Sequence, residues 1–172
     1  MTAIQAVEQL LEDNWESEAD AVDGRINDVP QPYILREKDT DRRRVNLQDG
    51  DYIFVIDGGK PAIEPRSLGW TEERIETIVA LDIYTSHSRE RLLGERQSDG
   101  TNEGNVGESY GGLAGETKRI MDVHRKGFQE WDMLIASTFD DLQSQTGAGI
   151  WRGQWELRMV QIASNINVGN DC

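Results

Sequence analysis

The sequence predicts an α+β fold: a twisted, mostly antiparallel sheet of about five strands with two helices packed on one face. Two kinds of periodicity lead to this prediction. Apolar residues recur at helical spacing in two segments, whereas elsewhere they alternate with polar residues or run together over strand-length segments. The expected order is α-β-β-β-α-β-β without internal repeats. The chain of 172 residues is expected to form a single domain, residues 1–172.

The first predicted helix covers residues 2–14. Its apolar side chains recur three or four positions apart, which places them on one face. They are Ile4, Val7, Leu10 and Leu11. Thr2 can act as the N-cap because its hydroxyl can accept a bond from a first-turn amide. Acidic residues lie on its outer face, so we expect a surface helix with one buried face.

Strand signals follow in the first half of the chain. Pro30 and Pro32 prevent a continuing helix, and a strand is predicted from Tyr33 to Leu35. The strongest strand signal is residues 51–57, where consecutive β-favouring residues are stopped by Gly58-Gly59. Pro61 and Pro65 then predict an irregular connection.

The second half is expected to contain a long strand, a loop, a helix and two closing strands. Residues 74–84 alternate between apolar and other side chains, and we expect this strand to pair with residues 51–57. A long flexible loop is predicted at about 85–112, with its glycine-rich part at 94–112.

The second predicted helix begins near Leu113. Leu113, Thr117, Ile120, Met121 and His124 fall on one of its faces. Gly127 is expected to be the C-cap, with Arg125 and Lys126 in the last turn. The closing strands are predicted at 131–139 and 151–159, joined by a hairpin loop at 140–149.

The chain is strongly acidic, which bears on its surroundings. Asp and Glu total 32 against 18 Lys and Arg, giving a formal net charge of -14. The only lysines are Lys38, Lys60, Lys118 and Lys126. At molar salt the Debye length is roughly 3 Å, so self-repulsion is screened and the carboxylates keep the surface hydrated. We therefore expect a halophilic source and a fold that melts when salt is dialysed out.

The charge balance also disfavours nucleic-acid binding through a basic face, because affinity for DNA depends mainly on phosphate neutralisation. The one basic run, Arg42, Arg43 and Arg44, lies among aspartates and is expected to be a solvated loop. No apolar run approaches the roughly 20 residues that cross a bilayer, and the N-terminus lacks the pattern of a secretory signal.

Two loop motifs resemble ligand sites but fail on spacing. The glycine-rich segment 107–118 is not a Walker motif, because Lys118 is the third residue after Gly115 rather than the next. Residues 99–110 begin like a calcium loop, yet the position that requires a bidentate Glu is Tyr110. Whether this loop binds an ion is left open.

The sequence also lacks residues at the spacing of a known catalytic or metal-binding motif. His87 and His124 have no second imidazole or Cys at ligand spacing, and the single cysteine is Cys172. Asp140 and Asp141 are expected to be turn residues that point apart rather than an acid–base pair. We therefore predict a protein that is not an enzyme and holds no cofactor and no metal.

Aromatic residues supply the candidate contacts with other proteins. Trp151 and Trp155 share one face of the last strand and are expected to be core residues. Trp15, Trp70 and Tyr110 are the candidate interface anchors. Arg42, Arg43 and Arg44 complete the candidate interface, because the loop 36–50 that carries them could reach a neighbouring subunit.

The order of segments resembles a known family. An N-terminal amphipathic helix precedes the strand that starts at Pro32-Tyr-Ile-Leu35, the strand Asp51-Tyr-Ile-Phe-Val-Ile56 and the strand Thr77-Ile-Val-Ala-Leu-Asp-Ile83. One central helix and two closing strands follow. This layout resembles the tail terminator, or tail completion, proteins of tailed phages and archaeal tailed viruses. The long insertion at 85–112 departs from this family layout. It leaves the residues that would contact neighbouring subunits unassigned.

The resemblance implies a structural virion protein, assembled in the host cytoplasm and located in the tail or neck. In that family a hexameric ring caps the tail tube, stops its polymerisation and joins it to the head connector. The implied partners are further copies of the chain, the tail tube protein and the connector or neck proteins, while DNA passes through the lumen without sequence-specific binding. The alternatives are another neck subunit, such as a head-completion or connector protein, or a small intracellular enzyme or ligand-binding domain.

Overall fold

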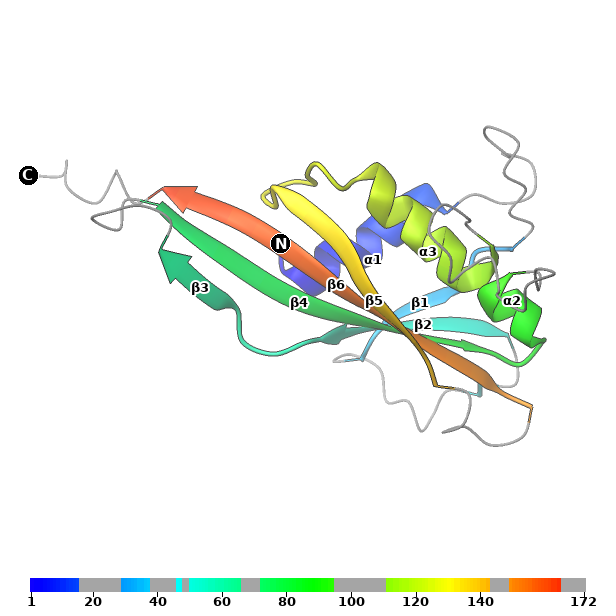
Figure 1. Cartoon of the computed structure of the whole chain (residues 1–172). Helices are drawn as coiled ribbons and strands as arrows, with labels where there is room; N and C mark the ends of the chain where they lie inside the picture. The colour runs from blue at the N-terminus through cyan, green and yellow to red at the C-terminus, as the bar shows by residue number, and fades with distance from the viewer. Residues whose placement is uncertain are drawn as a thin grey trace, which may run out of the picture.

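The computed structural model describes residues 1–15, 29–37, 46–47, 50–65, 72–94, 111–142 and 149–164. Within these ranges the elements are α1 (Ala3–Asn14), β1 (Tyr33–Arg36), β2 (Asp51–Asp57), β3 (Ala62–Pro65), β4 (Glu72–Thr85), α2 (Arg89–Leu93), α3 (Gly112–Val123), β5 (Met133–Asp141) and β6 (Trp151–Ser164). They form one sheet in the order β1-β2-β4-β6-β5, with β3 beside β4 (Figure 1). Only β1 and β2 pair in parallel. The predicted α+β fold is confirmed.

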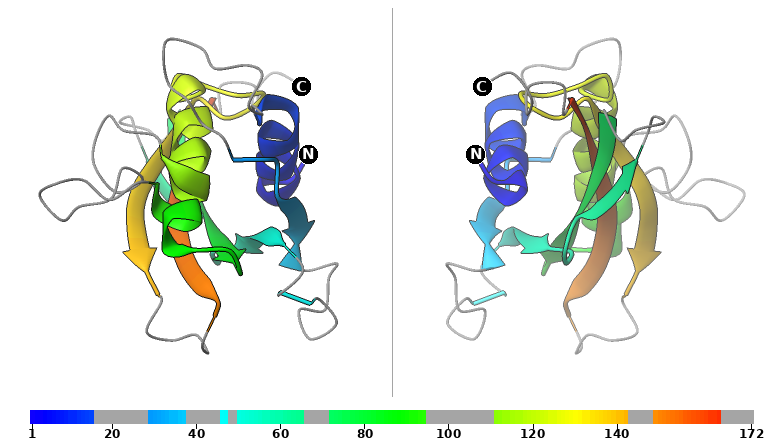
Figure 2. Two further views of the ribbon diagram at one scale, coloured as in Figure 1. Left: turned by 90° about the vertical axis from the view of Figure 1, so that its right-hand side faces the viewer. Right: turned by 90° about the vertical axis from the view of Figure 1, so that its left-hand side faces the viewer.

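Helices α1 and α3 lie side by side on one face of the sheet (Figure 2). Helix α1 begins with a capping box, in which the side chains of Thr2 and Gln5 each accept a bond from the other's backbone amide. Its buried residues are Ala6, Val7, Leu10 and Leu11. Periodicity and capping agree here, and the helix predicted at 2–14 is confirmed.

The central strands β4 and β6 pair along their whole length, from Glu72 opposite Ser164 to Thr85 opposite Trp151. Because side chains alternate between the two faces of a strand, Val79, Leu81 and Ile83 all point toward the helices and are buried there. The other neighbour of β4 is β2, in antiparallel register, as predicted.

Two predicted connections contain regular structure instead. Residues between Pro61 and Pro65 form β3, an edge strand in which a proline is tolerated because the outward-facing position needs no amide. The predicted loop 85–112 contains α2, whose N-cap Ser88 accepts a bond from the Arg91 amide. Its Leu92 and Leu93 are wholly buried, which explains why this short segment folds onto the sheet. Residues 95–110 lie outside the described part.

The two helices α2 and α3 approach closely at their ends. Gly112 has φ +69°, and a Cβ there would lie 2.5 Å from the amide nitrogen of Gly94. Only glycine allows both this backbone angle and this distance.

The end of α3 differs from the prediction. The helix ends at Val123 with His124 as C-cap, so Gly127 is not the cap and has φ +134° in the following turn. Arg125 and Lys126 therefore lie beyond the helix rather than in its last turn. The predicted boundary was wrong because it assumed that the available glycine would end the helix.

The closing strands are also longer or shifted. Strand β5 runs through Asp140 and Asp141, which were predicted as turn residues, because both pair with β6. Strand β6 continues five residues past the predicted end at 159, to Ser164, because β4 supplies a partner for each added position.

Candidate functional site

The ends of three strands extend beyond the helix layer and form what we call the arm: β3, residues 72–76 of β4 and residues 160–164 of β6 (Figure 1). All of β3 is exposed, and residues 72–76 are only partly buried. Register places Ile63 opposite Ile75, and Pro65 opposite Glu73. These four side chains share the face that, further along β4, packs against the helices.

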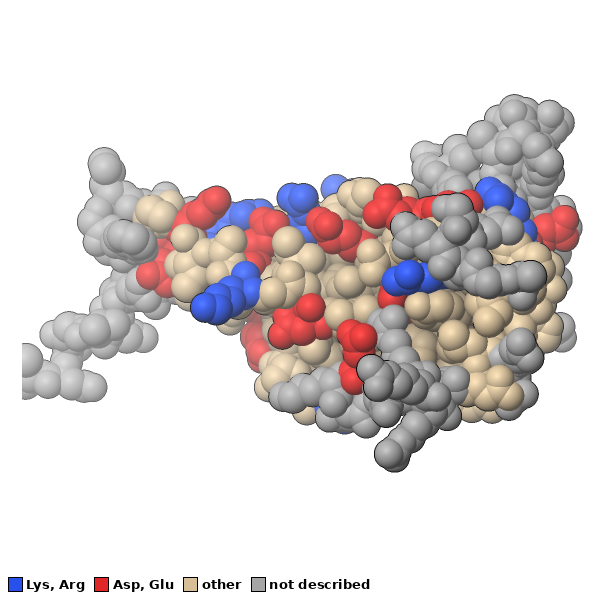
Figure 3. Space-filling view, turned by 90° about the horizontal axis from the view of Figure 1, so that it is seen from below, with Lys and Arg blue, Asp and Glu red and all other residues tan. Residues whose placement is uncertain are grey.

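The opposite face of the arm and of the strands that lead into it carries a ladder of ion pairs. Arg74 pairs with Glu76 at 2.7 Å and lies 4.0 Å from Glu64. Arg158 lies 3.6 Å from Glu76 and 3.2 Å from Glu156. Figure 3, which views this face, shows acidic and basic side chains interleaved along the arm. The charges on this face therefore largely satisfy one another, although exposed pairs contribute little stability.

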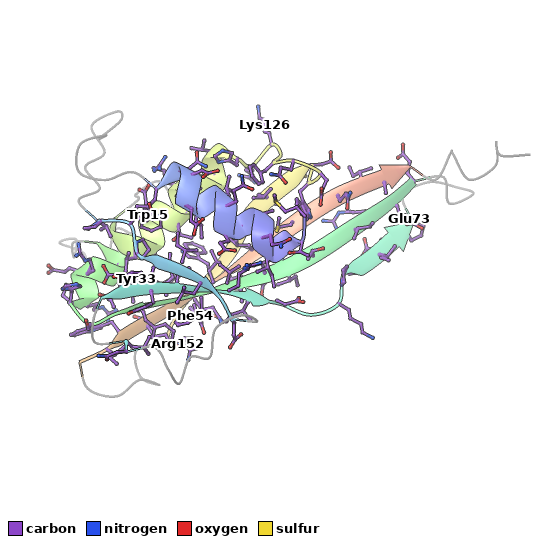
Figure 4. The ribbon with its side chains drawn as sticks, turned by 180° about the vertical axis from the view of Figure 1, so that it is seen from behind. Trp15, Tyr33, Phe54, Glu73, Lys126 and Arg152 are labelled. Atoms are coloured by element: carbon purple, nitrogen blue, oxygen red, sulfur yellow. The ribbon has the colours of Figure 1, made fainter. Side chains whose placement is uncertain are left out.

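The helix-side face of the arm is different, because it combines apolar surface with an unpaired charge. Ile63 is 56% exposed. Among the residues that the structure describes, the Glu73 carboxylate makes no ion pair or hydrogen bond. Figure 4 shows Glu73 out on the arm, away from the body of the domain. This face has no covering element in the described part of the chain.

A second surface of mixed character lies where α3 ends. Val123, Arg125 and Lys126 form what we call the turn patch. Val123 is 66% exposed, and both basic side chains are exposed without an ion pair to any described residue. Figure 4 shows Lys126 projecting outward from this turn. The turn patch is thus apolar and positive, whereas the helix-side face of the arm is apolar and negative.

Buried carboxylates form three clusters with polar or basic partners, and the first surrounds Asp51. Asp51 is 8% exposed, and its Oδ1 accepts a hydrogen bond of 2.6 Å from the Thr85 hydroxyl. The Arg91 Nε lies 3.1 Å from Oδ2, and the His87 Nε2 lies 3.9 Å from Oδ1. The His87 side chain is 54% exposed. This cluster joins β2, β4 and α2, which is a structural role.

The second cluster surrounds Asp82 on the sheet face away from the helices. Its carboxylate is 1% exposed and accepts bonds from Arg152 at 2.9 Å and Gln154 at 2.8 Å. The Arg152 guanidinium also lies 5.4 Å from the centre of the Tyr84 ring. These contacts tie β4 to β6, with both oxygens of the carboxylate engaged.

Aromatic rings continue this cluster across the sheet. Tyr33 stacks on Tyr52 with ring centroids 5.1 Å apart, and Phe54 meets Tyr84 edge-to-face at 5.7 Å. Tyr52, Phe54 and Tyr84 form a small second core, and Tyr33 remains 61% exposed at the edge strand. Figure 4 places Tyr33, Phe54 and Arg152 on the lower part of the sheet. These rings lie on the face of the sheet away from α1 and α3.

The third cluster joins the two long helices. Glu116 is fully buried and accepts a bond of 2.9 Å from Arg119 Nε, while Arg119 also donates to the backbone oxygen of Asn14 at 3.0 Å. In each of the three clusters, the buried carboxylate faces a basic side chain.

Two shallow hollows accompany these surfaces. One of about 300 Å³ lies between the end of α1 and the end of α3, and Val123, Arg119 and His124 are among its lining residues. Another of about 290 Å³ lies beside the N-terminal end of α1, with Arg36, Asp57 and Thr77 in its lining. Arg36 pairs with Glu8, and Asp57 accepts from the Gly59 amide. The lining of the first hollow also includes the Asp13 carboxylate, while the Nδ1 of its His124 lies 2.9 Å from the Ile120 oxygen.

The described residues contain no group of three or more His, Cys, Asp or Glu side chains placed to hold a metal ion. No helix in the described part of the chain is both long and apolar enough to cross a bilayer. His124 instead packs against Phe128 and has its Nδ1 2.9 Å from the Ile120 oxygen.

The predicted interface residues have different outcomes. Trp15 is 9% exposed, belongs to the main core, and donates from its indole to the Val29 oxygen at 3.0 Å. It is therefore a core residue in this structure rather than an exposed anchor. The other candidates, Arg42, Arg43, Arg44, Trp70 and Tyr110, lie outside the described residues. Trp155 is a core residue as predicted, and Trp151 is partly buried against the same core.

The arm and the turn patch were not found from the sequence. Alternation in residues 74–84 identified a strand with one apolar face, but it did not indicate that the helices cover only part of that face. A usable signal is the polar content at the start of that strand, Glu72-Glu-Arg-Ile-Glu-Thr77, compared with Ile78-Val-Ala-Leu81. No model of a known protein family matches the chain, and no curated protein matches it either.

Proposed function

We propose that this chain is a structural subunit of a virion that assembles with copies of itself into a ring and acts as a tail terminator. It would cap the tail tube and join it to the connector or neck proteins. The observation that carries the self-assembly is the arm, whose helix-side face exposes Ile63 and carries a partly buried Glu73 that makes no ion pair with the described residues. The tail assignment comes from the order of segments described above.

The arm supports assembly because Val160 is the one buried side chain among its described residues. Strands β4 and β6 could end where the helix layer ends without loss of the main core, yet both continue for several residues. A projecting sheet segment with exposed apolar side chains is suited to burial against another protein. Repeated contact between two different surfaces of the same chain closes into a ring when the rotation permits.

The buried clusters support a structural role rather than an enzymatic one. Asp51, Asp82 and Glu116 are the buried carboxylates of the described residues, and each holds elements of the fold together. An active site usually keeps at least one titratable group available to a substrate. The contacts of these three carboxylates are consistent with joints between strands and helices.

The acidic charge fits a channel through which DNA moves. A net charge of -14 gives the subunit a negative field, and a lumen of the same sign as the phosphates does not retain the genome. We extend the proposal to carboxylates along the lumen, which a ring structure with an arginine-lined pore would contradict. Another head–tail neck subunit is the nearest alternative, since it uses the same kind of assembly.

The test combines mass measurement with microscopy. Purified protein in high salt is examined by multi-angle light scattering and negative-stain microscopy, and rings of about six chains of 19.4 kDa are expected. Labelling of the particle that contains the protein should place it at the head–tail junction. A stable monomer that binds a nucleotide would instead favour the enzyme alternative, and labelling at the capsid vertices or tail tip would exclude a tail terminator.

A further inference from the structure

We propose that copies of the chain are joined by the arm of one copy docking on the turn patch of the next. In this contact Ile63 and Ile75 pack against Val123, while Glu73 faces Arg125 and Lys126. The inference rests on the proposed self-assembly and names the two surfaces that would make it.

The arm presents its apolar and acidic groups together. Ile63 and Ile75 are opposite each other in the β3–β4 register, and Glu73 is two residues from Ile75 on the same face. A strand rises about 3.3 Å per residue, so the carboxylate lies roughly 7 Å along the arm from the apolar pair. The opposite face has its own ion pairs, such as Arg74 with Glu76, and is not needed for the contact.

The turn patch presents the complementary set of groups, one apolar and two basic. Val123 is the last residue of α3, and Arg125 and Lys126 follow in the turn. The nearest acidic residue of the helix, Asp122, is already held by Lys118. The two basic side chains therefore keep their charge available on a surface that also exposes Val123.

A second copy is the partner that these charges favour. Two chains of charge -14 repel at long range, so a contact between them needs a local pairing of opposite sign. Glu73 on one surface and Arg125 with Lys126 on the other provide that pairing. Because the two surfaces are different, the contact can repeat from copy to copy as a heterologous interface, the kind that closes into rings when the rotation permits.

Charge exchange tests the pairing directly. Glu73→Lys and Lys126→Glu are each introduced alone and then combined, and assembly is measured by sedimentation velocity over a range of protein concentrations in one buffer. Each single change places like charges together and should weaken assembly by about tenfold or more. The combined variant restores opposite charges and should assemble within a few-fold of wild type.

Matched controls separate this contact from a general effect of charge. Glu12→Lys changes the net charge as Glu73→Lys does, but on the exposed face of α1, and Lys60→Glu matches Lys126→Glu. Both controls should assemble like wild type. Circular dichroism in the assay buffer verifies that every variant is folded.

A cysteine pair provides an independent test. With Cys172 replaced by serine, Ile63→Cys and Val123→Cys are combined in one chain. Oxidation should then join successive copies into covalent ladders, whereas either cysteine alone should give no species beyond a dimer.

The outcomes distinguish the docking contact from the proposed function. A wild-type chain that stays monomeric at all concentrations and salt levels would overturn both. If wild type assembles but the single variants behave like the controls, self-assembly stands and the docking contact is wrong. Weakening by both single changes without restoration in the combined variant would also overturn the pairing of Glu73 with Lys126.

Discussion

The same two strands behave differently in the body of the domain and in the arm. In the body, the helix-side residues of β4, such as Leu81 and Ile83, are wholly buried beneath the helices. In the arm, Ile75 lies on the same face of the same strand but is only partly buried. The backbone pairing between β4 and β6 is continuous through both regions. Pairing therefore holds the arm in shape, whereas the core beneath the helices stabilises the body.

The largest effect is expected where the helices cover the sheet. Leu81→Ala removes a fully buried side chain from the main core and should lower the free energy of unfolding by about 2–5 kcal/mol. Urea unfolding at fixed salt, followed by circular dichroism, measures the change. A loss below about 1 kcal/mol would mean that the core at this position relaxes around the cavity, and the contrast with the arm would weaken.

A smaller effect is expected at the polar joint between β2 and β4. Thr85→Val keeps the shape of the side chain but removes the hydroxyl that donates to the buried Asp51 carboxylate. The loss should be about 1–3 kcal/mol, because Asp51 stays buried with one partner fewer. Ser137→Ala is the control, since its exposed hydroxyl donates to Glu156 and should contribute within about 0.5 kcal/mol. If both variants lost the same free energy of unfolding, burial of the hydrogen bond would not determine how much its removal destabilises the fold.

The elements that the sequence predicted correctly are those whose local signals agree. Helix α1 has apolar spacing and a capping box, and β2 has consecutive β-favouring residues ended by Gly58-Gly59. In both cases the residues that form the element also determine its boundary. Because the signal lies within the segment, no knowledge of its neighbours was needed.

The elements that were missed depend on contacts distant in sequence. Helix α2 has only five residues, too few for periodicity, and is held by Leu92 and Leu93 in the core. Trp15 is buried because its indole bonds to the Val29 oxygen, fourteen residues later. The exposed face of the arm depends on where α1 and α3 end above the sheet. The alternation of apolar and polar residues within β4 does not show how far these helices cover the strand.

The smallest effect on the isolated chain is expected in the arm, at the position that matches Leu81. Ile75 lies on the same face of β4 but is only partly buried, so Ile75→Ala should lower the free energy of unfolding by less than about 1 kcal/mol. The unfolding curve is measured at a protein concentration low enough to keep the chain monomeric. The measurement is then repeated on assembled protein, where truncating a side chain buried between copies should lower the free energy of unfolding by more than it does in the monomer.

A loss of unfolding free energy in the monomer as large as that of Leu81→Ala would contradict the distinction between body and arm. An equal, small loss in both states would mean that this face stays uncovered in the assembly, because a contact that buried Ile75 would have to make its removal more costly there.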